Sequence, residues 1–418
     1  DQLKKLKDKN IFCTYFAYVD FEKLKNGIYS SDYWKELLQN NKLKMEDSIF
    51  LHIYFPNKIN NYIKSTQNFQ AINKEKKIFH FFIENLFSFK IFFKVVKTWF
   101  KNLFKYKKID EYIKNSLRDK KSNFLYMLRS DFKETLIGTE SLISLYYFYL
   151  FEELVNIIEK PKNVFYLFEN QGWEKSFVYN IKKLNPNIFA ITHSTIRYWD
   201  LRFSFNDKKL YANFLPNFYA ANGNDTFRKL KEGKFPINQI KKIEAIRFSN
   251  LISKTSQLKL TKKNFNNKIL ILGDYHHESN INLSKSLNLL NKKFINRYSF
   301  TLKEHPLRKM SHLLNISYDL TKKNIFELSD EFNIAIVANT TSAIVDLYLL
   351  GFKIISVLDD NQINLSPLKQ NADICFLKDK SLLLDYLNKL DRINLIKSEK
   401  KDFFYSTKNL SLWKEILG

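Results

Sequence analysis

TLKEHPLRK, residues Thr301–Lys309, follows an apolar and aromatic run that is typical of a short β-strand. Pro306 is expected to end this strand, because proline has no N–H for the ladder, and a helical pattern starts at Ser311. Lys303 and His305 are therefore predicted to lie where a strand ends and a helix is about to begin. In an open parallel α/β sheet, ligands bind at this edge.

A second turn of this kind lies in the run NIAIVANTTSAIVDLYLLGFKIISVL, residues Asn333–Leu358, which passes from a buried strand through a polar turn into a helix. Free N–H groups at a helix start, together with hydroxyl groups, can bind phosphate, and a simple N-cap is the alternative. The histidine and lysine of the first turn would add hydrogen bonds and positive charge. The two turns predict a phosphate-binding site formed by Gly273, Lys303, His305, Pro306, Asn339, Thr340, Thr341 and Ser342.

The chain of 418 residues is too long for one hydrophobic core, and its strand and helix patterns alternate in two blocks. We expect an α/β protein with two Rossmann-like domains that face a cleft. The first domain is expected over residues 1–225, and the second over residues 226–395. Residues 396–418 are predicted to form a helix that crosses back. Near the N-terminus, Ser30–Leu38 is predicted to be a helix capped by Ser31.

Two strand ends in the first block carry side chains that could act as a general base. Glu169 follows the strand NVFYLF, and His193 follows the strand IFAIT. Either group could deprotonate a hydroxyl group of an acceptor. Helix capping is the alternative role for Glu169. Just beyond His193, Arg197 and Arg202 could hold an anionic substrate or could lie in a solvated turn.

The formal net charge of +25 is compatible with nucleic acid, an anionic membrane surface or anionic substrates. No nucleic-acid-binding motif is visible, so no such partner is expected. Residues 87–108 are rich in aromatic residues and are predicted to form a cationic amphipathic helix. Such a helix could bind in the interface of an anionic membrane. The pattern is equally compatible with a helix that packs in the core and exposes only its lysine face to solvent. Six of its lysines share one face: Lys90, Lys94, Lys97, Lys101, Lys105 and Lys108.

The cysteine and histidine patterns point away from disulfides and metals. Cys13 and Cys375 lie far apart in apolar runs, which indicates a reducing compartment. The adjacent His276 and His277 cannot easily share one ion, so no metal is expected. Neither a signal peptide nor an apolar run of membrane-spanning length is visible. We therefore expect a cytoplasmic protein, with peripheral contact at the inner face of the membrane if residues 87–108 bind lipid.

Four segments, TYFAYVD, SDYWKELL, ENQGWEK and NTTSAIVDLYLLGFKII, resemble bacterial surface-carbohydrate biosynthesis glycosyltransferases of the GT-B type. The chain is similar in particular to sialyltransferase-like and Kdo-transferase-like enzymes that use CMP-activated sugars. Their His-Pro motif matches His305-Pro306, and their Ser/Thr pair matches Thr341-Ser342 or Thr340-Thr341. Their acidic base motif is nearest to Glu169–Gly172, which has amides where a second acid is common.

This resemblance implies a metal-independent glycosyltransferase that needs no cofactor. It would transfer an acidic nonulosonate-type sugar (sialic, pseudaminic or legionaminic acid, or Kdo) from a CMP donor to a bacterial surface glycan or glycolipid. Residues 1–225 would be the acceptor-binding domain, and residues 226–395 the nucleotide-sugar-binding domain. Glu169 or His193 would be the base, and His305 would stabilise the departing phosphate. The alternatives are a GT-B enzyme with a UDP-sugar, GDP-sugar or CDP-alcohol donor, a non-catalytic polysaccharide-assembly protein, and a nucleic-acid-binding protein.

Overall fold

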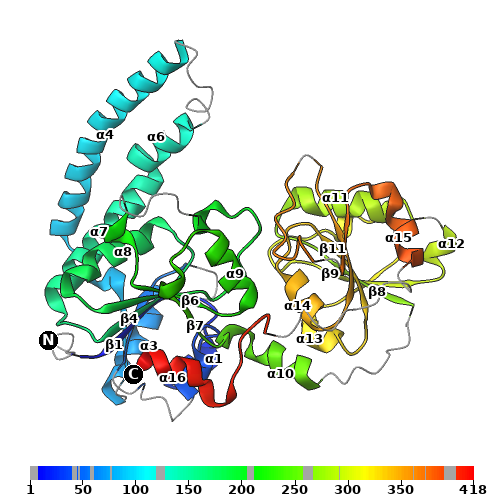
Figure 1. Ribbon diagram of the computed structural model, residues 1–418, viewed down its shortest axis with the longest axis horizontal. Helices are drawn as coiled ribbons and strands as arrows, with labels where there is room; N and C mark the ends of the chain where they lie inside the picture. The colour runs from blue at the N-terminus through cyan, green and yellow to red at the C-terminus, as the bar shows by residue number, and fades with distance from the viewer. Residues whose placement is uncertain are drawn as a thin grey trace.

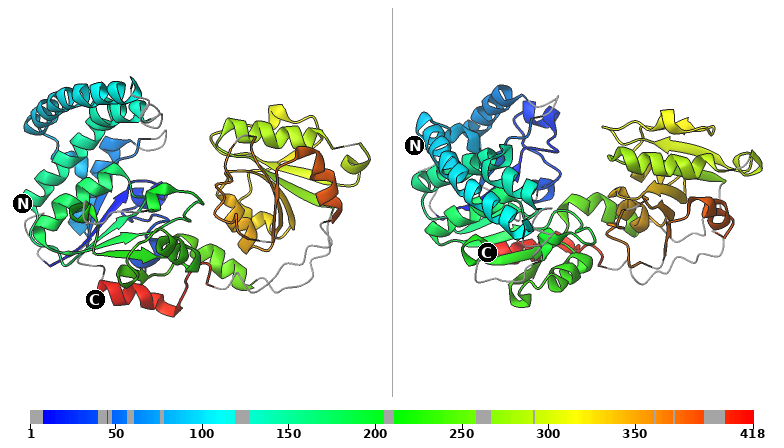
Figure 2. Two further views of the ribbon diagram at one scale, coloured as in Figure 1. Left: turned by 45° about the horizontal axis from the view of Figure 1, so that its top comes forward. Right: turned by 90° about the horizontal axis from the view of Figure 1, so that it is seen from above.

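The chain folds into two α/β domains, each built on a parallel sheet, which confirms the predicted fold class (Figures 1 and 2). Parallel strands are covered by helices on both faces, which explains why their sequences read as continuous apolar runs. The computed structural model describes residues 8–39, 45, 48–56, 61–75, 78–118, 128–204, 211–257, 267–290, 292–360, 362–371, 373–389 and 402–418.

The first sheet has seven strands in the order β3-β2-β1-β4-β5-β6-β7. Strand order reverses between β1 and β4, so this point of the sheet is the topological switch where open α/β folds bind ligands. The carboxyl ends of β4 and β5 lie side by side at the same edge. The strands are β1 (Asn10–Tyr15), β2 (Ser48–Ile53), β3 (Phe79–Phe82), β4 (Asn163–Leu167), β5 (Asn187–Ile191), β6 (Phe218–Ala221) and β7 (Ile240–Lys242).

The second sheet has six strands in the order β10-β9-β8-β11-β12-β13. Strand β9 ends at Lys303, at the position that the opening stretch predicts, but the helix expected from Ser311 is a single 3-10 turn, Ser311–Leu313. The strands are β8 (Lys268–Leu272), β9 (Ser299–Lys303), β10 (Asp319–Leu320), β11 (Ile334–Ala338), β12 (Lys353–Val357) and β13 (Ile374–Leu377).

The helices differ from the sequence predictions at further places. Of residues 396–418, predicted to form a helix, the described part 402–418 is helical only over a 3-10 turn, Lys408–Leu410, and α16, Ser411–Leu417. Helix α2 begins at Lys35, because Ser31 instead forms an isolated bridge with Val19 and its hydroxyl accepts from the N–H of Tyr33. Helix α4 runs beyond the predicted residues 87–108 to Arg118. The first-domain helices are α1 (Phe21–Lys25), α2 (Lys35–Gln39), α3 (Tyr62–Glu75), α4 (Phe89–Arg118), α6 (Arg129–Ile137), α7 (Thr139–Ile157), α8 (Gly172–Ile181) and α9 (Asn224–Glu232).

The second domain is covered by shorter helices, and the chain then returns to the first domain. Within the described ranges, no helix is both long enough and apolar enough to cross a membrane. Strand β7 lies beyond residue 225 and still belongs to the first sheet, and helix α9, which crosses residue 225, packs against β6 and β7. The remaining helices are α10 (Ser249–Gln257), α11 (His277–Asn288), α12 (Lys292–Ile295), α13 (Ile325–Leu328), α14 (Ala343–Leu349), α15 (Leu383–Lys389) and α16 (Ser411–Leu417).

An aromatic core lies on one face of the first sheet. Phe12 of β1 stacks between Phe50 of β2 and Phe165 of β4, with ring centroids 4.9 and 4.8 Å apart. Trp413 of α16 packs edge-on against Trp34 in the same core. Helix α16 therefore lies on the first domain, although the whole second domain separates it from β7 in the sequence (Figure 1).

Candidate active site at the carboxyl edge of the first sheet

The two candidate bases lie in contact. Glu169 follows β4 and His193 follows β5, and these neighbouring parallel strands bring the Glu169 Oε1 and His193 Nε2 atoms to 3.2 Å. The His193 side chain is 4% exposed, whereas that of Glu169 is 30% exposed. The carboxylate is thus the member of the pair that is open to a ligand.

A second carboxyl group, that of Glu174, holds the loop that carries Glu169. It accepts hydrogen bonds from the backbone N–H groups of Glu169 and Asn170 at 2.9 Å and of Gln171 at 3.2 Å. Asn170 has a φ of +57°, a left-handed conformation that asparagine tolerates better than most residues. Glu174 is buried in the first turn of α8 and acts as a structural cap for this loop.

The pKa values of the two carboxyl groups move in opposite directions. The hydrogen bond from His193 lowers the pKa of Glu169 below its ordinary value, against the opposing effect of burial. Burial raises the pKa of Glu174 to about 8, although three backbone N–H groups oppose this shift. Glu169 is therefore the carboxyl group that is ionised at neutral pH.

A neutral imidazole has one N–H group. When Nε2 donates it to Glu169, the Nδ1 atom keeps a lone pair. This Nδ1 atom is buried and has no hydrogen-bond partner among the described residues. The ring of Tyr33 lies edge-on to the His193 ring, with centroids 5.0 Å apart. This packing fixes the orientation of the imidazole toward Glu169.

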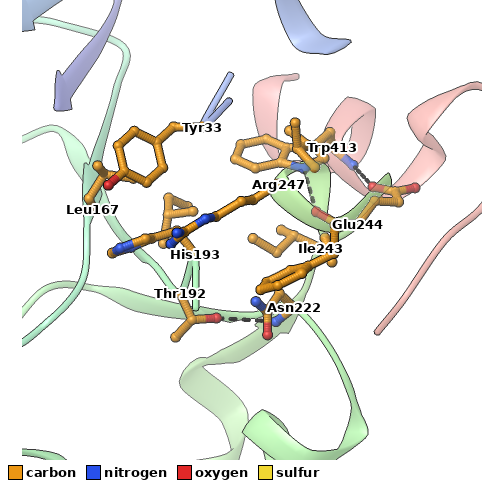
Figure 3. Close-up of a pocket in the computed structure, with 13 residues that line it drawn as sticks. Tyr33, Leu167, Thr192, His193, Asn222, Ile243, Glu244, Arg247 and Trp413 are labelled. Atoms are coloured by element: carbon orange, nitrogen blue, oxygen red, sulfur yellow. Dashed lines mark hydrogen bonds between the residues drawn. The ribbon is translucent and has the colours of Figure 1, made fainter. Parts of the chain in front are cut away.

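A pocket next to His193 carries a cation that the sequence analysis did not identify. The Arg247 guanidinium lies over the ring of Tyr33 at 5.5 Å and over that of Tyr18 at 5.0 Å. Figure 3 shows Arg247 extending toward Tyr33 and His193. In the sequence, Arg247 is marked only as a basic residue in the apolar stretch AIRF. Its position beside His193 is therefore visible only in the fold.

Of the two arginines that sequence analysis singled out, Arg202 is paired with Asp200, at 2.9 and 2.7 Å. Arg197 instead reaches the second domain, where its Nη2 atom donates to the carbonyl oxygen of Thr340 at 3.4 Å. Thr340 follows β11. The carboxyl edges of the two sheets therefore meet at this contact.

In the second domain, the predicted polar residues after β11 divide into two groups. Thr340 donates through its hydroxyl to Asp274 at 2.8 Å, and Asn339 donates through its amide to Asp359 at 3.3 Å. Both side chains are buried and join the turns after β8, β11 and β12. Thr341 is half-buried and Ser342 is exposed, so these two are the more accessible hydroxyl groups.

The opening stretch forms a compact turn. Lys303 Nζ donates to the carbonyl oxygen of Lys323 at 2.8 Å, and burial lowers its pKa. His305 accepts at Nδ1 from the Leu307 N–H at 3.2 Å, and its ring lies edge-on to Tyr275. These contacts join His305 to the loop after β8, the loop in which Gly273 lies.

Gly273 and Pro306 have backbone roles in these loops. A Cβ atom at Gly273 would lie 2.9 Å from Met310 Sδ, so glycine permits this close packing. Pro306 lies exposed in the turn between His305 and Arg308, which form an isolated bridge. Neither residue offers a side-chain donor to a phosphate. Any contact of theirs with a nucleotide would be through the backbone.

Comparison with models of protein families found no match, and comparison with curated proteins found none either. The fold, however, matches solved structures. UDP-GlcNAc 2-epimerase from Neisseria meningitidis bound to UDP-GlcNAc is 11% identical, with 98% of each chain covered and a TM-score of 0.50. A further UDP-N-acetylglucosamine 2-epimerase is 9% identical, with 98% of this chain and 95% of that chain covered and a TM-score of 0.50. The Methanocaldococcus jannaschii enzyme in complex with UDP-GlcNAc and UDP is 13% identical, with 98% and 99% covered and a TM-score of 0.48.

The two structural matches at a TM-score of 0.50 show a shared fold, the GT-B-like arrangement of two Rossmann-like domains. They contradict the expected transfer of a nonulosonate from a CMP donor to a surface glycan or glycolipid, and the CMP-activated partner. The two neighbours with a TM-score of 0.50 are described as UDP-GlcNAc 2-epimerases, whereas the resemblance to sialyltransferase-like enzymes, with its His-Pro and Ser/Thr matches, had implied a CMP donor. Short strand-end motifs recur in folds that bind different nucleotides, so they do not identify the base.

Proposed function

We propose that this protein is an enzyme that binds a UDP-activated sugar and processes it with Glu169 as the proton-transferring group. The observation that carries this proposal is the 3.2 Å contact of Glu169 with His193 at the carboxyl edge of the first sheet. Support comes from the Neisseria meningitidis neighbour, whose structure is described as bound to UDP-GlcNAc and which covers 98% of this chain.

The exposures of the two side chains suggest their separate roles. The partly exposed Glu169 carboxylate accepts a proton from the sugar or from an acceptor hydroxyl. His193 is a positioning residue, because its Nε2–H holds the carboxylate and keeps it ionised. Arg247, next to this pair, supplies positive charge for an anionic part of the substrate.

We assign the uridine diphosphate to the turns after β8, β9 and β11 of the second domain. Thr341, Ser342, Lys303 and His305 are the proposed side-chain contacts, because they are at least partly exposed. The side chains of Asn339 and Thr340 are buried and hydrogen-bonded within the domain. Gly273 and Pro306 shape the same turns. The Arg197 contact with Thr340 brings these turns toward the edge that carries Glu169.

Isothermal titration calorimetry with UDP, GDP, CMP and CDP tests the nucleotide. We expect UDP to bind most tightly. Turnover of UDP-GlcNAc, followed by NMR in D₂O, then tests the chemistry, since proton exchange at a sugar carbon and release of UDP give different signals. Glu169→Gln is expected to keep UDP binding and to lose about 10²–10⁴-fold in turnover. Absence of uridine nucleotide binding, or full turnover by this variant, would contradict the proposal.

A further inference from the structure

Helix α4 carries a row of exposed aromatic side chains that no part of the described structure covers. Phe89, Phe93 and Phe104 are 79%, 65% and 65% exposed, and Phe92 and Phe100 are about half exposed. At 3.6 residues per turn, all five fall on one face of the helix. Exposed large aromatic side chains in one continuous row mark an interaction surface.

A different face of α4 attaches it to the first domain. Ile91 and Val95 are buried in the first-domain core. The Trp99 indole donates to the Ile137 carbonyl oxygen of α6 at 2.9 Å, and Thr98 is hydrogen-bonded to Tyr149 of α7 at 2.6 Å. The phenylalanine row is therefore not the packing face of this helix, and its exposure is not explained by a core role.

Lysines run along α4 beside the phenylalanine row. The sequence from Phe89 to Ile109 contains no acidic residue. Lys94 is paired with Glu152 of α7, so it is not part of the free cationic surface. The exposed members of the lysine row are Lys90, Lys97, Lys101, Lys105 and Lys108.

We propose that α4 lies in the interface of an anionic lipid bilayer, with the phenylalanine row among the acyl chains and the lysine row at the headgroups. Charge complementarity favours an anionic bilayer as the binding partner of α4. The lysine row, with no acidic residue beside it, matches the anionic headgroups, and the phenylalanine row matches the apolar interior. The helix of 30 residues, about 45 Å long, gives a continuous contact. It lies on the side of the first domain that faces away from the second domain, which leaves the proposed UDP-sugar site free (Figures 1 and 2).

Vesicle co-sedimentation of the full chain tests this proposal. Vesicles of phosphatidylcholine alone are compared with vesicles of equal parts phosphatidylcholine and phosphatidylglycerol, at low and at high ionic strength. We expect binding to the anionic vesicles only, and weaker binding at high salt. This comparison needs no variant. Equal binding to both vesicle types, or no binding to either, would overturn the proposal.

Two triple variants separate the lysine row from the phenylalanine row. Each is expected to weaken binding to anionic vesicles by about tenfold or more, while the melting temperature stays near that of the wild type, because all six residues are exposed. A charge-matched control reverses three exposed lysines elsewhere and is expected to bind like the wild type. The variants are Lys97→Glu, Lys101→Glu and Lys105→Glu; Phe93→Ser, Phe100→Ser and Phe104→Ser; and the control Lys231→Glu, Lys268→Glu and Lys378→Glu.

The competing occupant of the phenylalanine row is a second copy of this chain. Analytical ultracentrifugation without lipid distinguishes the two. A wild-type dimer that the phenylalanine variant converts to a monomer would overturn the membrane proposal, and so would a control variant that loses as much binding as the lysine variant. Because UDP titration does not involve α4, failure of membrane binding and failure of the proposed function give separate results.

Discussion

At the scale of single residues, three side chains at the end of β4 and β5 have distinct tasks. Glu169 is ionised and accessible, His193 is buried against it, and Glu174 holds the loop beneath them. Sequence analysis identified Glu169 and His193 as competing bases. The structure shows them as hydrogen-bonded partners, because adjacent parallel strands place their carboxyl ends together.

Replacing His193 with leucine should move the acid limb of the pH–rate profile. The hydrogen bond from His193 lowers the pKa of Glu169, so its loss raises that pKa. A base works only when deprotonated; the variant should therefore lose kcat at a higher pH than the wild type as the medium is acidified. Steady-state kinetics of UDP-GlcNAc turnover across pH measures this shift. Arg202→Gln removes a lesser contributor and should shift the limb less, and an unchanged limb in His193→Leu would contradict the assigned role.

Replacing Glu174 with alanine should destabilise the first domain. The change leaves three backbone N–H groups at the start of α8 without their acceptor. We expect a loss of about 1–3 kcal/mol in the free energy of unfolding, measured by urea titration. Glu174→Gln keeps one carbonyl oxygen and should lose less. Equal stability of wild type and the alanine variant would show that these hydrogen bonds contribute nothing.

At the scale of elements, β2 and β3 bury two histidines in contact. His52 Nε2 lies 3.1 Å from His80 Nδ1, and the His52 ring stacks on Phe69 of α3 with centroids 4.7 Å apart. Burial, and secondarily His80, lowers the pKa of His52 below its ordinary value. A charged imidazolium in this aromatic layer would lose its hydration without gaining an anion.

This pair should make the first domain sensitive to acid. The unfolded chain binds a proton at His52 below about pH 6.5, whereas burial disfavours protonation of His52 in the folded chain. The free energy of unfolding is therefore highest above that pH and falls as the pH drops below it. The wild-type melting temperature should therefore drop as the pH is lowered from 7 to 5. His52→Phe should show a shallower dependence in calorimetric scans. The same slope in both proteins would count against this source of acid sensitivity.

At the scale of the whole molecule, hydrogen bonds connect the two domains and also connect the C-terminal segment to the first domain. Lys229 of α9 donates to the carbonyl oxygen of Pro367 at 3.1 Å, beside the Arg197 contact with Thr340. Glu244, just after β7, accepts from the N–H groups of Leu412 and Trp413 at 2.9 and 3.0 Å. Because β7 belongs to the first sheet, we propose that the boundary between the domains lies in α10 rather than near residue 225.

The return of α16 should matter for the stability of the first domain. Trp413 is buried against Trp34 and Phe165, so Trp413→Ala leaves a cavity between α16 and the sheet. We expect the free energy of unfolding to fall by about 3–5 kcal/mol. Trp199→Ala, at an exposed position, is the matched control and should change stability by about 0.5 kcal/mol or less. Chemical denaturation followed by circular dichroism measures both, and equal effects would contradict the role of α16.

The fold class, and the strand ends that carry Glu169, His193 and Lys303, are predicted correctly from the amino-acid pattern alone. A parallel strand that is buried on both faces requires a continuous apolar run, and the polar residues that follow it lie at the carboxyl edge of the sheet. The local sequence pattern is therefore sufficient to predict where these strands end. The helix boundaries were less well predicted. At Ser31 the bridge to Val19, a contact between distant residues, replaced the local capping signal.

Which of these residues come into contact depends on the assembly of the folded chain. Strand order places Glu169 beside His193, and the 3-10 turn after β7 brings Arg247 to the same edge; neither follows from spacing along the chain. The same holds for α4, where periodicity gives the lysine face but packing on α6 and α7 leaves the phenylalanine row exposed. Periodicity is a local property of the chain, whereas contact depends on how the layers assemble.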